Sequence, residues 1–166
     1  LLMSNRHASG VVNSLSGSPI VEKHELSGLR KLTRQLREGR FPADLLPASS
    51  LVEEGALLLI PRSMWRVSCA RRLGVDSVEI SGVDIASRVL AHFITEDSKV
   101  FPYLISIDRA YEQWVERLDD TIHQYFFERL GDVVLFEVRD ALAQKVRKQF
   151  GLPCVSDFRP GSIDDW

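Results

Sequence analysis

The densest group of residues that could bind a ligand lies at the C-terminal end of the printed sequence. It combines a cation, a rigid and a permissive backbone position, a hydroxyl, two acids and an indole. In order, these residues are Arg159, Pro160, Gly161, Ser162, Asp164, Asp165 and Trp166. A proline–glycine pair favours a tight turn whose main-chain groups can contact an adenine edge or an amino-acid carboxylate. A plain β-turn held by an aromatic side chain is the other interpretation of the same residues.

Other familiar catalytic and metal-binding patterns are missing from the sequence. It has no phosphate-binding glycine loop, no dinucleotide turn, no H-E-x-x-H, no C-x-x-C and no G-x-S-x-G. His92 and His123 fall on different predicted helices without a ligand-like partner, so we expect no metal site. The two cysteines, Cys69 and Cys154, are too few for a disulfide scaffold, and we expect reduced thiols.

A group of acids, Glu116, Asp119 and Asp120, marks one predicted helix. Paired carboxylates can perform acid–base chemistry where burial moves their pKa values apart. Because Arg109 and Arg117 lie nearby in the sequence, we favour a solvated charged face for this group.

Length and composition indicate one ordinary globular domain. The chain has 166 residues, of which 45% are hydrophobic and 27% charged. Its longest apolar run, 56–60, falls far short of the roughly 20 residues that span a membrane. The start of the sequence lacks the apolar stretch of a secretory signal, so we expect a cytoplasmic protein. The net charge of −2 gives no general attraction to nucleic acid or anionic lipid, and we expect neither as a partner.

The charge and composition change along the chain. Residues 1–40 hold seven Lys/Arg and three Asp/Glu, a balance of +4, against −6 for the remainder. Ser, Gly and Asn dominate the first twenty residues, so we expect a mobile tail over 1–26 and a domain over 27–166. A helix is predicted over 27–38, where Arg30, Arg34 and Arg37 form a stripe. We favour a solvated face for this stripe over a contact with phosphate or an acidic partner.

The middle of the chain alternates between helical and strand patterns. A helix is expected from Ser50, with Glu53 completing a capping box and Pro61 ending it. Strands are expected over 64–69 and 75–80, and a helix capped by Asp84 runs to Thr95. Residues 100–107 are apolar on both faces, which is typical of a buried central strand with Pro102 near its start or at a gap in pairing.

Two long amphipathic helices are expected next, over 108–130 and 132–150, with Gly131 and Gly151 as their stops. A short strand at 154–156 follows. This order predicts an α+β fold with a small mixed or antiparallel sheet packed by long helices.

Several short motifs occur in an order that resembles a known family. They are Leu59-Ile60-Pro61-Arg62, the helix pattern 85–90, the strand 104–107, the Gly131-Asp132 helix reaching Asp140, and Pro160-Gly161-Ser162 before Trp166. Together they cover about residues 50–166. In this order they resemble the activation domain of cobalamin-dependent methionine synthase and its short stand-alone relatives.

The resemblance implies a binding site for S-adenosylmethionine (AdoMet). It places Arg159, Pro160, Gly161 and Ser162 in the groove-lining turn, with Asp164 and Asp165 beside them. It also implies a partner protein or domain that carries the corrinoid, because this chain lacks the D-x-H-x-x-G cobalamin-ligand motif. A flavodoxin-type electron donor is a further implied partner. Family domains continue past the tryptophan, so we expect the domain to be C-terminally truncated here.

Three positions depart from the family pattern. Asp157 stands where the family carries an arginine that contacts AdoMet, Ser162 replaces a common tyrosine, and Gln144 replaces a glutamate. A carboxylate at 157 would repel the ligand's own carboxylate. Asp157 and the missing downstream segment favour the alternative function, a non-catalytic protein-interaction module that has lost AdoMet binding and docks a partner through its long helices or the Arg30/Arg34/Arg37 stripe.

Overall fold

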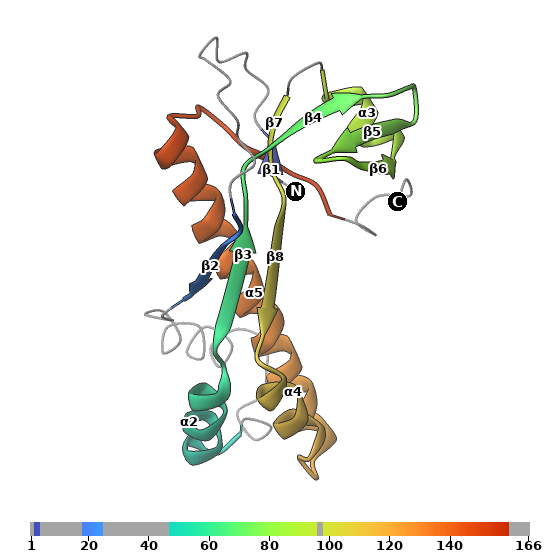
Figure 1. Cartoon of the computed structure of the whole chain (residues 1–166). Coiled ribbons are helices and arrows are strands. Elements are labelled where there is room, and N and C mark those ends of the chain that lie inside the picture. The colour runs from blue at the N-terminus through green and yellow to red at the C-terminus, as the bar shows by residue number, and fades with distance from the viewer. Residues whose placement is uncertain (1, 4–17, 25–46, 96–97, 160–166) are drawn as a thin grey trace. The chain divides into compact units, whose positions relative to one another are not determined.

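The computed structural model describes residues 2–3, 18–24, 47–95 and 98–159. The fold is α+β, as the sequence predicts, with antiparallel strand pairing and four helices in the described part (Figure 1). The chain forms two units. Unit 1 comprises Leu1–Ile20, Met64–Leu104 and Leu142–Trp166, and unit 2 comprises Val21–Ser63 and Ile105–Ala141.

A six-stranded sheet makes up most of unit 1. Its strand order is β6-β5-β4-β7-β1-β9, and every neighbouring pair is antiparallel. The strands are β1 (Leu2–Met3), β4 (Ser68–Arg72), β5 (Ser77–Ile80), β6 (Val83–Ala86), β7 (Ser98–Phe101) and β9 (Ser156–Asp157). Apolar side chains from β4, β5 and β7 form one core with α3 (Arg88–Phe93). Burial of such side chains is the main stabilising contribution to the unit.

A tight hairpin joins β5 to β6. Ser81 and Gly82 have φ values of 54° and 79°, and Ile80 pairs with Val83 across the turn. Two successive positive φ angles are typical of the type I′ turn, whose twist matches a β-hairpin. The prediction that Asp84 caps a helix is therefore wrong, because Asp84 lies in β6 opposite Glu79.

Helix α3 begins three residues later than Asp84 would place it. Ser87 is its N-cap, and the Ser87 hydroxyl accepts a hydrogen bond of 3.0 Å from the Leu90 N–H. The helix lies beside the β5–β6 hairpin (Figure 1). Leu90, Ala91 and Ile94 are buried there.

The three-stranded sheet has the order β2-β3-β8. Its strands are β2 (Ile20–Lys23), β3 (Pro61–Trp65) and β8 (Tyr103–Ile107). Pro102 separates β7 from β8, which confirms the predicted gap, and its carbonyl accepts a hydrogen bond from the Arg66 N–H. The prediction of a strand buried on both faces is wrong for β8, since Leu104 is 59% exposed.

Strands β1 and β2 fall within the segment predicted as an N-terminal tail. β1 pairs with β7 and β9, and β2 pairs with β3; local composition does not reveal such pairing. Residues 1, 4–17, 25 and 26, and the helix predicted over 27–38 with its arginine stripe, lie outside the described residues. The tail and the 27–166 domain stay predictions.

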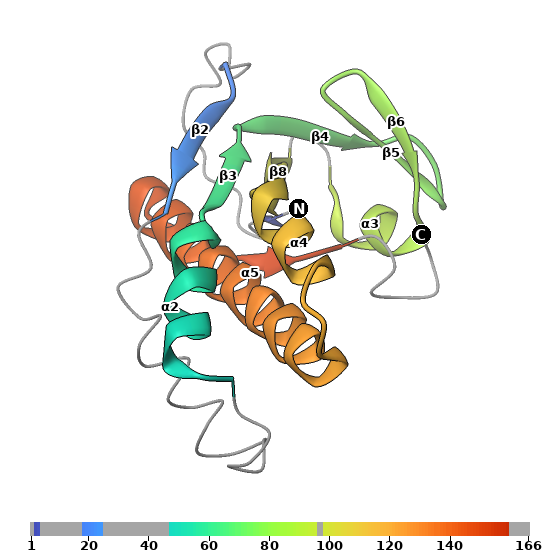
Figure 2. The same cartoon turned by 90° about the horizontal axis from the view of Figure 1, so that it is seen from below.

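Unit 2 is built around three helical segments: α2 (Ser49–Leu58), α4 (Arg109–Glu116) and the first part of α5 (Thr121–Phe150) (Figure 2). Trp114 of α4 packs edge-on against Phe127 of α5, with ring centroids 4.7 Å apart. A Cβ on Gly55 of α2 would come within 2.8 Å of the Trp114 ring. The glycine that weakens α2 by propensity is thus required by the close approach of this indole.

Helix α5 runs without interruption through Gly131, so the prediction of a stop at this glycine is wrong. The break falls instead between Glu116 and Thr121. Gly131 is buried, and a Cβ there would lie 3.4 Å from Ile107 Cδ1 and 3.5 Å from Tyr111 Cε1. Gly131 therefore lies inside a packed part of the helix and does not terminate it.

Helix α5 ends at Phe150, which confirms the predicted stop at Gly151. Gly151 has a φ of 62°, and the Leu152 N–H donates to the Arg147 carbonyl. This left-handed position after the last turn is a common helix C-cap. In unit 1, the Phe150 ring then packs against Phe101 and Trp65, with centroid distances of 5.0 and 6.5 Å.

The two mid-helix glycines should respond oppositely to Gly→Ala substitution. Gly55→Ala should lower the free energy of unfolding by about 1–3 kcal/mol, because its Cβ would overlap the Trp114 ring. Gly131→Ala should raise it by up to about 1 kcal/mol through helix propensity, since its Cβ would meet only ordinary contacts. Urea unfolding measures both. A large loss of stability for Gly131→Ala would contradict the packing described.

Two serines near helix starts provide a matched test of capping. Ser87→Ala should cost about 1 kcal/mol of stability because the α3 cap is lost. Ser50→Ala should be close to neutral, since the N-cap of α2 is Ala48 and no side chain caps that helix. Thermal unfolding of both variants checks this, and equal effects would refute the assignment of the caps.

Candidate functional site

The structure describes the approach to the predicted ligand-binding turn. Strand β9 pairs with β1, with Asp157 opposite Leu2 and Ser156 opposite Met3. Phe158 follows with only 8% of its surface exposed, and its ring lies 5.2 Å from that of Phe93. The predicted site residues Pro160, Gly161, Ser162, Asp164 and Asp165 lie outside the described residues. The chain entering the turn is therefore held by sheet pairing and by a buried aromatic ring.

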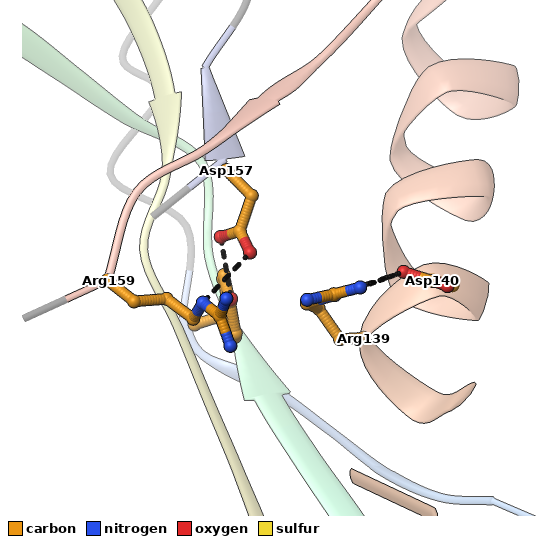
Figure 3. A network of polar contacts seen from close by, with 5 residues as sticks. Arg139, Asp140, Asp157 and Arg159 are labelled. Atoms are coloured by element: carbon orange, nitrogen blue, oxygen red, sulfur yellow. Dashed lines mark hydrogen bonds and ion pairs between the residues drawn. The ribbon is translucent and has the colours of Figure 1, made fainter. Parts of the chain in front are cut away.

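Arg159 and Asp157 form an ion pair (Figure 3). Arg159 Nε lies 3.4 Å from Asp157 Oδ2, and the Tyr103 hydroxyl donates a hydrogen bond of 2.7 Å to Asp157 Oδ1. The Arg159 side chain is 45% exposed, so this ion pair contributes little to stability. The ion pair matters more for ligand binding. The guanidinium of Arg159, which is predicted to bind the ligand, is already paired with Asp157, the residue that departs from the family pattern.

A second candidate site, which the sequence did not predict, is a groove in unit 2 between α4 and α5. Its volume is about 450 Å³, and it has an apolar floor edged by carboxylates. The floor consists of Ile107, Tyr111, Val115, Gly131 and Leu135, and the carboxylates are those of Glu112, Glu116, Glu128 and Asp132. This volume falls within the range of small-molecule and cofactor sites, about 300–1,000 Å³.

The floor of this groove is fixed by Tyr111. The Tyr111 hydroxyl donates a hydrogen bond of 2.7 Å to the main-chain carbonyl of Phe127 on α5. Burial raises the pKa of Tyr111 well above its usual value, so its proton stays in place as the donor throughout the physiological range. The ring also lies next to Gly131 of α5, where a Cβ would be 3.5 Å from Tyr111 Cε1.

The edges of the groove carry negative charge in two rows. Glu112 and Glu116 are four residues apart on α4, and Glu128 and Asp132 are four residues apart on α5, so each pair occupies one helix face. No lysine, arginine or histidine is among the lining residues. Asp132 has an ion pair of 3.0 Å with Arg129, and both side chains are about half exposed.

The three acids Glu116, Asp119 and Asp120, which are grouped in the sequence, have different positions and contacts in the structure. Glu116 lines the groove, whereas Asp120 Oδ1 accepts hydrogen bonds from the main-chain N–H groups of Ile122 and His123 at the start of α5. Asp120 is thus a helix cap. Asp119 is exposed and does not line the groove.

Comparisons with protein-family models, with curated proteins and with solved structures find no match to this chain. Within residues 2–3, 18–24, 47–95 and 98–159, no three His, Cys, Asp or Glu side chains are grouped so that they could hold a metal ion. In the same part of the chain, no helix has both the length and the apolar character needed to cross a membrane. Cys69 and Cys154 are exposed and free.

Relief of charge repulsion in the groove should stabilise the protein. Glu116→Gln should raise the free energy of unfolding by about 0.5 kcal/mol, because it removes an i,i+4 repulsion and a negative charge at the C-terminal end of α4. Glu112→Gln should give less, since Glu112 lies in the first turn, where a negative charge is favourable. Urea unfolding at low and high ionic strength measures both, and the gain should shrink with salt. A gain that is equal for both variants and independent of salt would contradict this electrostatic origin.

Proposed function

We propose that the protein binds AdoMet at the turn 159–165 and supports reductive reactivation of a corrinoid methyltransferase held by a partner protein. The observation that supports this most is the placement of the residues just before the turn: β9 pairs in the sheet and Phe158 is buried immediately before Arg159. Sheet pairing and burial at this point would give Arg159 a defined position, which is what orientation of a ligand requires.

The part played by this chain is binding and orientation. The transfer chemistry belongs to AdoMet and to the partner's corrinoid, with the electron supplied by a flavodoxin-type donor. Arg159 is the residue that would pair with the carboxylate of the ligand, and it must exchange its ion pair with Asp157 to do so.

The alternative function is a protein-interaction module without AdoMet binding. The observation that favours it is the contact of Asp157 with both Arg159 and Tyr103, which places a negative charge beside the expected ligand carboxylate. In this function the helices of unit 2 dock a partner.

Calorimetric titration of AdoMet separates the two functions. The first predicts saturable binding that Arg159→Ala weakens by about tenfold or more, the size of a charge-assisted hydrogen bond. Asp157→Asn should tighten binding, because it frees the guanidinium and removes a repulsive charge. Arg129→Ala serves as the control, since Arg129 is also an exposed, ion-paired arginine. Absence of binding at millimolar AdoMet would refute the first function and leave the second.

A further inference from the structure

We propose that the groove between α4 and α5 docks a basic amphipathic helix of a partner protein, with lysine or arginine side chains between the two rows of carboxylates. This inference deepens the second of the two functions above, because it names the surface and the chemistry of the partner. It rests on residues of unit 2 alone and does not require AdoMet.

The first support is the composition of the groove itself. Its floor offers Ile107 and Leu135, both partly exposed, above the buried Tyr111 and Val115. A purely charged surface would attract any cation, whereas an apolar floor between charged edges matches a ligand that has apolar and basic sides. An amphipathic helix presents such sides along its length.

The second support is the length of the binding stripe on α5. Tyr125, Glu128, Asp132 and Phe136 follow one another at spacings of three, four and four, so they lie along one face of the helix. Tyr125 is 55% exposed and Phe136 46% exposed. The carboxylates of α5 are thus flanked on both sides by exposed aromatic rings, a residue type enriched in protein interfaces.

This stripe covers about 16 Å, the rise of a helix from residue 125 to residue 136. Such a length corresponds to about three turns of a partner helix. A small polyamine would pair with the carboxylates alone, whereas a helix of this length would also cover the exposed faces of Tyr125 and of Phe136, whose ring already lies 5.0 Å from the Arg139 guanidinium. The stripe therefore favours a helix of a partner protein as the occupant.

The third support is electrostatic. The i,i+4 spacing of the carboxylates on each helix places like charges side by side, which destabilises the helices in the absence of a cation. Basic side chains at i and i+4 of a partner helix would have the same spacing and would relieve the repulsion on both edges. The Arg129–Asp132 ion pair is exposed and weak, so it does not compete strongly.

The test uses the full chain and a fluorescein-labelled helical peptide of about 18 residues, with leucine on one face and lysine on the flanks. Fluorescence anisotropy without AdoMet should show saturable binding that weakens at high ionic strength. The same peptide with glutamate in place of lysine should not bind. Because AdoMet is absent, this assay can fail while the AdoMet titration succeeds, and the reverse.

Matched variants locate the binding. Glu116→Gln/Glu128→Gln, with one change on each side of the groove, should weaken binding by about tenfold or more. Glu53→Gln/Glu137→Gln removes the same charge from exposed positions outside the groove and should change binding by less than about twofold. Tyr125→Ser/Phe136→Ser, at exposed positions, should also weaken it.

Three results would overturn the proposal. They are no saturable binding of the lysine peptide, equal weakening by the groove variant and the control variant, and displacement of the peptide by spermidine with no effect of Tyr125→Ser/Phe136→Ser. The last would assign the groove to a small polycation. Circular dichroism verifies that every variant keeps its helices.

Discussion

The hydrogen bond from the Tyr111 hydroxyl to the Phe127 carbonyl is the interaction on which the groove between α4 and α5 depends. It fixes the ring of a buried tyrosine on α4 against the backbone of α5, and Trp114 of α4 packs against the Phe127 ring. Ile107 and Tyr111 both lie next to Gly131 of α5, where a Cβ would make ordinary van der Waals contact with them. The apolar floor of the groove lies between the two helices, and their exposed carboxylates form its edges.

Local sequence patterns predicted those features whose causes are local. The α+β class follows from the order of helical and strand patterns. The C-terminal stop at Gly151 and the gap at Pro102 follow from the backbone preferences of single residues. The predictions for Gly131 and Asp84 are wrong because glycine and aspartate have more than one structural use. Gly131 lies inside a helix next to Ile107 and Tyr111, and Asp84 lies in a strand whose hairpin partner sets its conformation. Neither use is visible without the tertiary neighbours.

The two candidate sites differ in how far the sequence could predict them. The order of motifs leads to Arg159 and the following turn, and the structure adds the ion pair between Arg159 and Asp157. The groove forms only because the chain breaks between α4 and α5. The sequence-based prediction of a single helix over 108–130 has no such break, so it does not predict the groove. The available signal was the pair of four-residue spacings, Glu112 with Glu116 and Glu128 with Asp132. Only the reversal places these pairs on opposite sides of one floor.

The most direct test of this account is backbone NMR of the full chain. Helical Cα shifts are expected from 121 to 150 without a break at Gly131, with non-helical shifts between 116 and 121 and nuclear Overhauser contacts from the Gly131 Hα protons to the Tyr111 ring. A helix that instead continues through 117–120 and ends at Gly131, with no contact between Gly131 and Tyr111, would contradict it. The groove, its charged edges and the proposed docking of a basic helix would then have no structural basis.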